Sequence, residues 1–138
     1  MHLVDTSIWV HVLRRPLRGR TRIQELLKPL VVSGDAAITE WTILELMVGI
    51  RASEKTENVL RKFARLPRLG FPLAKWAESW TLAADLRKKG FTPSAADCFI
   101  STVAITHDVP LLHCDRDFEQ IAKHSKLNTI DWTEYLES

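Results

Sequence analysis

The sequence predicts an α/β protein whose central sheet is mainly parallel. Short apolar runs alternate along the chain with longer segments whose apolar residues recur at helical spacing, and glycines and prolines lie between many of them. Strands that are separated by helices pair in parallel through right-handed crossovers. The chain has 138 residues, the length of about one domain, and we find neither a repeat nor a linker in it. We therefore expect residues 1–138 to form a single domain.

Five short segments are predicted to be strands. They are the apolar runs 2–4, 36–38, 69–71, 109–112 and 127–130. In the third of these segments, Gly70 and the flanking prolines argue against regular pairing, because proline cannot donate to a sheet ladder.

Seven segments have the apolar spacing of helices. They are residues 6–13, 20–28, 39–49, 53–66, 74–89, 93–107 and 118–122. We expect Pro29, Pro67 and Gly90 to end three of these helices. Thr92 is expected to cap the helix that follows it, with Pro93 in its first position.

The composition is that of an ordinary globular protein, with 46% hydrophobic and 26% charged residues and a formal net charge of +2. The longest apolar runs are far shorter than the roughly 18 residues of a membrane span, and no basic and apolar leader precedes the first strand. Cys98 and Cys114 form neither a C-x-x-C pair nor a zinc-ligand spacing. These features predict a reduced, cytoplasmic protein without a membrane segment.

Five arginines crowd into a segment of nine residues that also contains Pro16 and Gly19. They are Arg14, Arg15, Arg18, Arg20 and Arg22. Two interpretations remain open, because such a run is either a solvated loop or helix face or a surface that contacts phosphates.

Four acidic residues occupy informative places in this scheme. Asp5 ends the first predicted strand and Asp115 follows the strand 109–112, so both belong at the carboxyl edge of the sheet, where open α/β folds place their ligands. Glu45 and Asp97 lie in helices among apolar neighbours, where an unpaired carboxylate is costly. Each acid by itself is also compatible with a surface position or a helix cap, and Asp5 can cap the helix 6–13.

Convergence of these four acids would favour a bound cation. Clustered carboxylates repel one another, and a cation allows all of them to stay ionised at neutral pH. A site made of oxygen ligands alone suits Mg²⁺ or Mn²⁺ better than zinc. Such metals support phosphodiester hydrolysis, so the pattern predicts a nuclease or a phosphatase.

Four blocks of the sequence resemble the motifs of PIN-domain ribonucleases, and more narrowly those of VapC toxins from bacterial toxin-antitoxin pairs. The blocks are residues 3–7 (LVDTS), Thr39 with Glu45-Leu46 and Gly49, Ala96-Asp97 with Ile100 and Ala104, and residues 111–118 (LLHCDRDF). The resemblance covers nearly the whole chain in order and spacing. It implies a PIN-like three-layer fold with helices on both sides of a sheet of strand order 3-2-1-4-5.

The resemblance also implies roles for particular residues. Asp5, Glu45, Asp97 and Asp115 match the acids that hold Mg²⁺ or Mn²⁺ and support catalysis. Thr6 or Ser7 matches a hydroxyl that orients a carboxylate or a water, and Asp117 matches a second acid that we interpret mainly as a helix cap supporting Asp115.

His113 departs from the family pattern, because many relatives have Thr or Ser there, hydrogen-bonded to the acidic cluster. A histidine can also donate to a carboxylate, so the departure does not exclude activity. Its charge state suggests the hypothesis of a pH-sensitive site, which an unaltered pH profile in His113→Thr would remove.

What the resemblance implies about function is a metal-dependent endoribonuclease. Similar proteins cleave structured RNA such as tRNA or an rRNA loop and so inhibit translation. They commonly form homodimers, and a VapB-like antitoxin restrains them. In this context Arg14, Arg15 and Arg18 are candidates for RNA binding near the mouth of the site.

The aromatic residues allow two interpretations. Trp41, Phe63, Trp76 and Trp80 would suit contacts with an antitoxin or a second copy, but we interpret most of them as core residues.

Other classes of protein fit the sequence less well. A haloacid-dehalogenase-like phosphatase needs a second Asp two residues after the first, and position 7 is serine. The acid and lysine set of a receiver domain is not clear, and the sequence has neither a glycine-rich phosphate loop nor an H-E-x-x-H motif. A non-catalytic PIN fold that only binds RNA or a partner stays open, although such a scaffold has no physical need for four mutually repelling acids.

Overall fold

The computed structural model describes residues 1–13, 21–49 and 56–136. Within these ranges the strands are β1 (His2–Val4), β2 (Ala36–Ala37), β3 (Leu111–His113) and β4 (Thr129–Asp131). The α-helices are α1 (Thr6–Leu13), α2 (Arg22–Val32), α3 (Glu40–Gly49), α4 (Thr56–Phe63), α5 (Trp76–Lys88), α6 (Ala95–His107) and α7 (Asp117–Lys123), with two short 3₁₀ turns, η1 (Leu73–Lys75) and η2 (Thr133–Tyr135). No helix among the described residues is long and apolar enough to cross a membrane.

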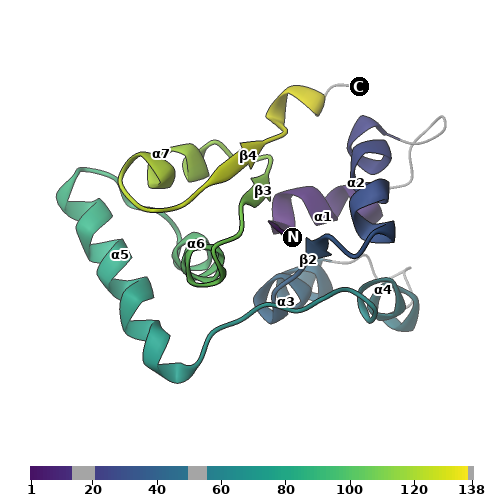
Figure 1. Cartoon of the computed structure of the whole chain (residues 1–138), viewed down its shortest axis with the longest axis horizontal. Coiled ribbons are helices and arrows are strands. Elements are labelled where there is room, and N and C mark those ends of the chain that lie inside the picture. The colour runs from purple at the N-terminus through teal and green to yellow at the C-terminus, as the bar shows by residue number, and fades with distance from the viewer. Residues whose placement is uncertain (14–20, 50–55, 137–138) are drawn as a thin grey trace.

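The strands form a parallel sheet in the order β2-β1-β3-β4 (Figure 1). The α/β class and the parallel sheet are therefore confirmed. Numbered as predicted, this order reads 2-1-4-5, and the third predicted strand, 69–71, does not form. Its place beside β2 is marked only by an isolated parallel bridge between Ile38 and Arg68.

Helices cover both faces of the sheet, as a three-layer fold requires (Figure 1). Side chains alternate along β1: Leu3 packs with α5, α6 and α7, whereas Val4 packs with helices α1 to α4. Both residues are fully buried, which explains why the strands read as continuous apolar runs.

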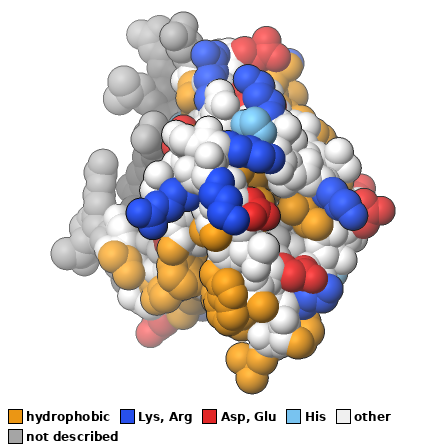
Figure 2. All heavy atoms as spheres, turned by 90° about the vertical axis from the view of Figure 1, so that its left-hand side faces the viewer, with side chains coloured by type: hydrophobic (Ala, Val, Ile, Leu, Met, Phe, Trp, Pro, Cys, Tyr) orange, Lys and Arg blue, Asp and Glu red, His pale blue; other side chains and the backbone are white. Residues whose placement is uncertain are grey.

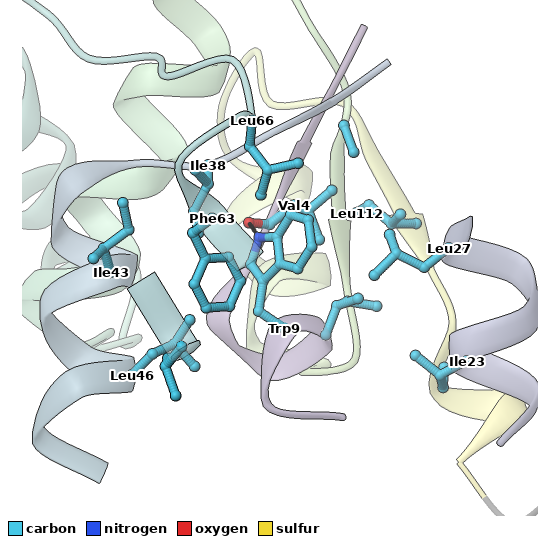
Figure 3. Packing of buried hydrophobic residues seen from close by; sticks show 13 residues of the cluster. Val4, Trp9, Ile23, Leu27, Ile38, Ile43, Leu46, Phe63, Leu66 and Leu112 are labelled. Carbon is cyan, nitrogen blue, oxygen red and sulfur yellow. Dashed lines mark hydrogen bonds between the residues drawn. The ribbon is translucent and has the colours of Figure 1, made fainter. Parts of the chain in front are cut away.

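Trp9 anchors the core on the α1 side. Its ring meets Phe63 edge to face at 5.6 Å, and its indole N–H donates to the Val4 carbonyl at 3.0 Å (Figure 3). The only polar atom of a 2% exposed side chain is thereby satisfied, and α1 is fastened to β1 directly behind Asp5.

Several helix boundaries differ from the prediction by a few residues, such as the end of α4 at Phe63 instead of residue 66, and two of the differences have a clear physical cause. Helix α2 continues through Pro29 to Val32, because Leu27 is buried and Leu30 packs against the same core, and this packing outweighs the lost backbone hydrogen bond. Helix α6 begins two residues after Pro93, since the hydroxyl of Ser94 accepts from the Asp97 N–H at 3.1 Å and so provides the N-cap.

Candidate active site

An open pocket of about 200 Å³ lies at the carboxyl edge of the sheet and is lined by all four predicted acids. Asp5 comes from the end of β1, Glu45 from α3, Asp97 from the first turn of α6 and Asp115 from the loop between β3 and α7. The remaining lining residues are Thr6, Ser7, Trp41, Thr42, Ser94, Ala96 and Ile100.

Asp5 joins the sheet to α1 and is 8% exposed. Its backbone N–H donates to the Leu112 carbonyl at 2.9 Å, while its own carbonyl accepts from the first N–H groups of α1. The carboxylate Oδ2 accepts from the Ser7 N–H at 3.0 Å. Asp5 therefore caps the helix and faces the pocket, so the two interpretations of its position are compatible.

Glu45 is held through its side chain. The Thr6 hydroxyl donates to Glu45 Oε1 at 2.8 Å, and Thr6 Oγ1 lies 3.2 Å from Thr42 Oγ1. Because a carboxylate only accepts, Thr6 gives its single hydroxyl hydrogen to Glu45 and accepts from Thr42. Thr39 continues this chain by donating to Thr42 at 3.1 Å.

Threonines 39 and 42 are buried, but Glu45 is exposed between the exposed residues Leu44 and Val48. The expectation that apolar neighbours would deprive Glu45 of solvent is therefore wrong. These neighbours face outward, and α3 buries Thr42, Ile43 and Leu46 instead.

Asp97 sits in the first turn of α6, where a negative charge also suits the helix dipole. The Ser94 hydroxyl accepts from its backbone N–H, so the S-x-x-D spacing fixes the acid against the pocket. The side chain of Asp97 is half-buried.

Asp115 and Asp117 complete the acidic group on this side of the pocket. Carboxylate oxygens of Asp97, Asp115 and Asp117 lie within 4.8 Å of one another. Asp117 begins α7, and its backbone N–H donates to Asp115 Oδ1 at 3.0 Å. The capping carboxylate is therefore that of Asp115, and Asp117 is placed to add an exposed carboxylate to the group.

Burial and neighbouring charges raise the pKa values of Asp5 and Asp97. Burial, followed by the charges of Asp5 and Asp115, raises the pKa of Asp97 to about 6. Burial also raises the pKa of Asp5, with a smaller contribution from the charge of Asp115, while hydrogen bonds from Ser7 and Thr6 oppose the shift. Desolvated carboxylates that repel one another fit a divalent cation, which would favour their ionised forms.

His113 is fully buried beneath the acidic loop. Its Nδ1 accepts from the Asp115 N–H at 3.1 Å, which assigns the ring proton to Nε2, and Nε2 donates to Glu119 Oε1 at 2.8 Å. Thr129 donates to the same carboxylate oxygen at 2.7 Å. His113 thus supports Asp115 through the backbone, and its proton goes to Glu119, which is not one of the four predicted acids.

Ser7 ties the two sides of the pocket together. Its Oγ accepts from the Cys114 N–H at 3.0 Å across 107 positions of sequence, and its side chain also bonds to Asp5. Both hydroxyl residues predicted behind the first acid therefore contact carboxylates of the site, Thr6 at Glu45 and Ser7 at Asp5.

Three polar or aromatic residues that line the pocket were not predicted to be site residues. Thr42 and Trp41 lie on the helix that carries Glu45, and a helical wheel centred on Glu45 would have placed Trp41 beside it, four residues away. Ser94 could have been found from its capping spacing to Asp97. The predicted RNA-binding residues Arg14, Arg15 and Arg18 lie outside the described residues.

Comparison with known proteins agrees with this architecture. The model of the PIN domain family matches residues 2–124. Ribonuclease VapC21 of Mycobacterium tuberculosis is 32% identical over 114 residues, which are 80% of this chain and 81% of the relative.

Solved structures share the fold at lower identity. The crystal structure of VapBC2 from Rickettsia felis bound to a DNA fragment from their promoter aligns with a TM-score of 0.73 and 21% identity, covering 95% of this chain and 98% of that one. FitAcB from Neisseria gonorrhoeae aligns with a TM-score of 0.70 and 20% identity, covering 95% and 97%.

These findings identify the class of the protein: the chain belongs to the PIN-domain family. Within that family its resemblance to a curated ribonuclease over four fifths of both chains places it among the VapC proteins.

Proposed function

We propose that this protein is a metal-dependent endoribonuclease, the toxin of a VapBC-type toxin-antitoxin pair. The observation that carries the proposal is the convergence of Asp5, Glu45, Asp97 and Asp115 on one pocket from four separate segments of the chain. The name of the relative VapC21, a ribonuclease, supports RNA as the polymer that is cleaved.

Mg²⁺ or Mn²⁺ is the cofactor that the donor set fits, because every candidate ligand is a carboxylate oxygen. Asp97, Asp115 and Asp117 have the mutual spacing to hold it, with Asp5 beside them. When bound, the cation supplies the Lewis acidity and charge neutralisation that phosphodiester hydrolysis needs.

The chain's own residues prepare the pocket for an anionic polymer. The Ser7 N–H donates to the Asp5 carboxylate, and the Ser94 hydroxyl accepts from the backbone N–H of Asp97 and so fixes the start of the helix that carries this acid. The threonine chain keeps Glu45 turned toward the pocket in spite of its solvent exposure. These contacts reduce the freedom that the acids would have to lose when substrate and cation bind.

Cleavage of RNA by the purified protein tests the proposal. Total cellular RNA would be incubated with Mg²⁺ or with Mn²⁺, beside chelated controls and the variants Asp5→Asn and Asp97→Asn. We expect discrete fragments that require the metal and disappear in both variants. Cleavage that is absent from the wild type, or equal in the variants, would contradict the proposal and favour a PIN fold that only binds.

Structured RNA such as tRNA or an rRNA loop is the proposed substrate, and inhibition of translation the proposed result, as the resemblance to VapC toxins implies. Mapping the fragment ends from the same digestion identifies the RNA. Arg14, Arg15 and Arg18 remain the proposed phosphate contacts. Replacing all three should weaken RNA binding and flatten its salt dependence without affecting metal binding.

A VapB-like antitoxin is the proposed protein partner, supported by the VapBC complexes that share the fold. Co-expression of the toxin with the product of the neighbouring gene, followed by co-purification, tests the pairing. An antitoxin that fails to suppress the RNA cleavage would contradict it.

We also propose a homodimer, formed through an apolar surface that the fold leaves open. Figure 2 shows hydrophobic side chains gathered over the lower part of the molecule, around the N-terminal end of α5. Leu73 of η1 is 85% exposed, and Trp80 of α5 is 65% exposed. The interpretation of Trp41, Trp76 and Trp80 as core residues is therefore wrong, whereas Phe63 is buried as expected.

Light scattering on Leu73→Asp tests this dimer, and Val32→Asp is a matched control. Val32 is 76% exposed, nearly as much as Leu73, but lies at the end of α2. We expect the first variant to be monomeric and the second to keep the mass of the wild type. Equal masses for all three proteins would contradict the proposed surface.

A further inference from the structure

Trp41 is the large apolar side chain among the exposed residues that line the acidic pocket. It lies four residues before Glu45 on α3, so both side chains project from the same face of that helix. Its ring is 38% exposed, although the next residue, Thr42, is 1% exposed. An aromatic surface thus stands open at the edge of a site built from carboxylates.

Other aromatic rings hold Trp41 in place from behind. Its ring lies 5.9 Å from that of Phe99, and Phe99 stacks on Trp76 at 5.3 Å with an interplanar angle of 27°. Phe71 closes the group by meeting both Phe99 and Trp76. A ring supported in this way loses little freedom when a second flat group settles on it.

The acids alone leave most of a nucleotide without a partner. Through a cation they can bind the phosphate, but they offer an unpaired base no favourable contact. Unpaired bases of RNA are typically bound by stacking on aromatic side chains. Trp41 is the lining residue with an exposed surface suited to that contact.

From this geometry we infer that Trp41 forms a stacking subsite for an unpaired nucleobase next to the scissile phosphate. The inference rests on the proposed ribonuclease function and adds a requirement on the substrate. The nucleotide that occupies the pocket edge has to be unpaired and has to carry a base. Every base has a flat face, so the subsite demands the presence of a base more than its identity.

Kinetics on a short single-stranded RNA that the wild type cleaves at one mapped bond test the subsite. The comparison substrates are two versions of the same RNA, each made abasic on one side of that bond. We expect Trp41→Ala to lower kcat/KM by about ten- to a hundredfold, the range of one base-aromatic stack, and Trp41→Phe to retain most of the activity. An abasic position at the subsite should cost the wild type a similar factor and cost Trp41→Ala almost nothing more.

Three controls separate stacking from other roles of Trp41. Mn²⁺ affinity should stay unchanged in Trp41→Ala, which excludes a damaged metal site. Val32→Ala, which also removes exposed apolar surface, should behave as the wild type. Binding of the intact and abasic RNAs measured with Ca²⁺ in place of Mg²⁺ gives the same comparison without turnover.

The possible outcomes distinguish this inference from the proposed function. If the wild type cleaves RNA and the kcat/KM of Trp41→Ala is within twofold of it, the stacking subsite alone is overturned. The same follows if Trp41→Ala lowers kcat/KM by the same factor on abasic RNA as on intact RNA. Trp41 would be assigned to a protein interface if Trp41→Ala became monomeric and lost the same factor in kcat/KM on intact and on abasic RNA. A wild type that neither cleaves nor binds RNA would overturn both.

Discussion

Glu45 and Asp115 line the same pocket, but the hydrogen bond that positions Glu45 is made by its side chain, whereas Asp115 is held by its backbone as well as by its carboxylate. Glu45 is exposed and receives one hydrogen bond from Thr6, at the end of a chain of threonine hydroxyls. The N–H of Asp115 donates to the buried His113, whose ring proton goes to Glu119.

The difference indicates which changes should affect activity and which should affect folding. Loss of a hydroxyl near Glu45 frees one exposed carboxylate, whereas loss of the fully buried His113 ring leaves the half-buried Asp115 N–H without its acceptor. Substitutions around Glu45 should therefore affect mainly activity, and substitutions around Asp115 should also affect folding.

The largest expected effect compares the two acids directly. Asp115→Asn should lower the rate of RNA cleavage by at least about a thousandfold, because the site loses one of its clustered charges. Glu45→Gln should cost only about ten- to a hundredfold, since the exposed Glu45 lies apart from the tight acidic group. Single-turnover rates at saturating Mn²⁺ measure both variants, and equal losses would remove the distinction.

His113→Phe tests the support of Asp115 through the backbone. The variant keeps the ring volume but leaves the Asp115 N–H without its acceptor and removes one of the two donors to the Glu119 carboxylate. We expect the free energy of unfolding to fall by about 1 to 3 kcal/mol. Urea denaturation measures the change, and Glu119→Gln, whose amide oxygen still accepts from His113, is the milder control. A variant as stable as the wild type would show that His113 does not hold the loop.

Thr42→Val tests the hydroxyl chain that leads to Glu45. Valine has a similar shape but cannot donate to Thr6, so we expect about tenfold slower cleavage with a loss of stability near 1 kcal/mol. Thr42→Ser should restore most of the rate, because it restores the donor. If valine and serine slow the reaction equally, packing rather than hydrogen bonding is responsible.

The smallest expected effect concerns stability and pH. Because the folded protein raises the pKa of Asp97 to about 6, this residue's contribution to stability is greatest at low pH and is lost as the pH rises through 6. Without metal, Asp97→Asn should therefore melt roughly 3 to 6 °C above the wild type at pH 8 and close to it at pH 4. Thermal melts across this range measure the difference, and adding Mg²⁺ at pH 8 should reduce it by stabilising the wild type. A constant difference at every pH would contradict the assignment.

Much of the fold and of the acidic site could be predicted because both depend on local patterns. The apolar run before Asp5 gave β1 its place, and the spacing of the motif blocks brought the four acids to one edge. The predicted strand 69–71 does not form, because Gly70 and the flanking prolines disfavour regular pairing, and only the bridge at Arg68 remains.

Long-range contacts explain what else the sequence did not reveal. No local pattern tells that Thr42 reaches Thr6, or that His113 faces Glu119 rather than the acids of the pocket. The continuation of α2 past Pro29 likewise depends on the core against which Leu30 packs. Such features are decided by partners that are distant in the chain.

The central position of β1 has a consequence for the timing of activity. Strand β1 pairs with β3, which is made more than a hundred residues later, and the hydrogen bond between Cys114 and Ser7 spans the same interval. The pocket around Asp5 can therefore form only after the segments that carry Asp97 and Asp115 have been made. A chain truncated before β3 lacks Asp115 and one side of the pocket, so the cell meets an assembled site only after β3 and the loop that follows it have been made.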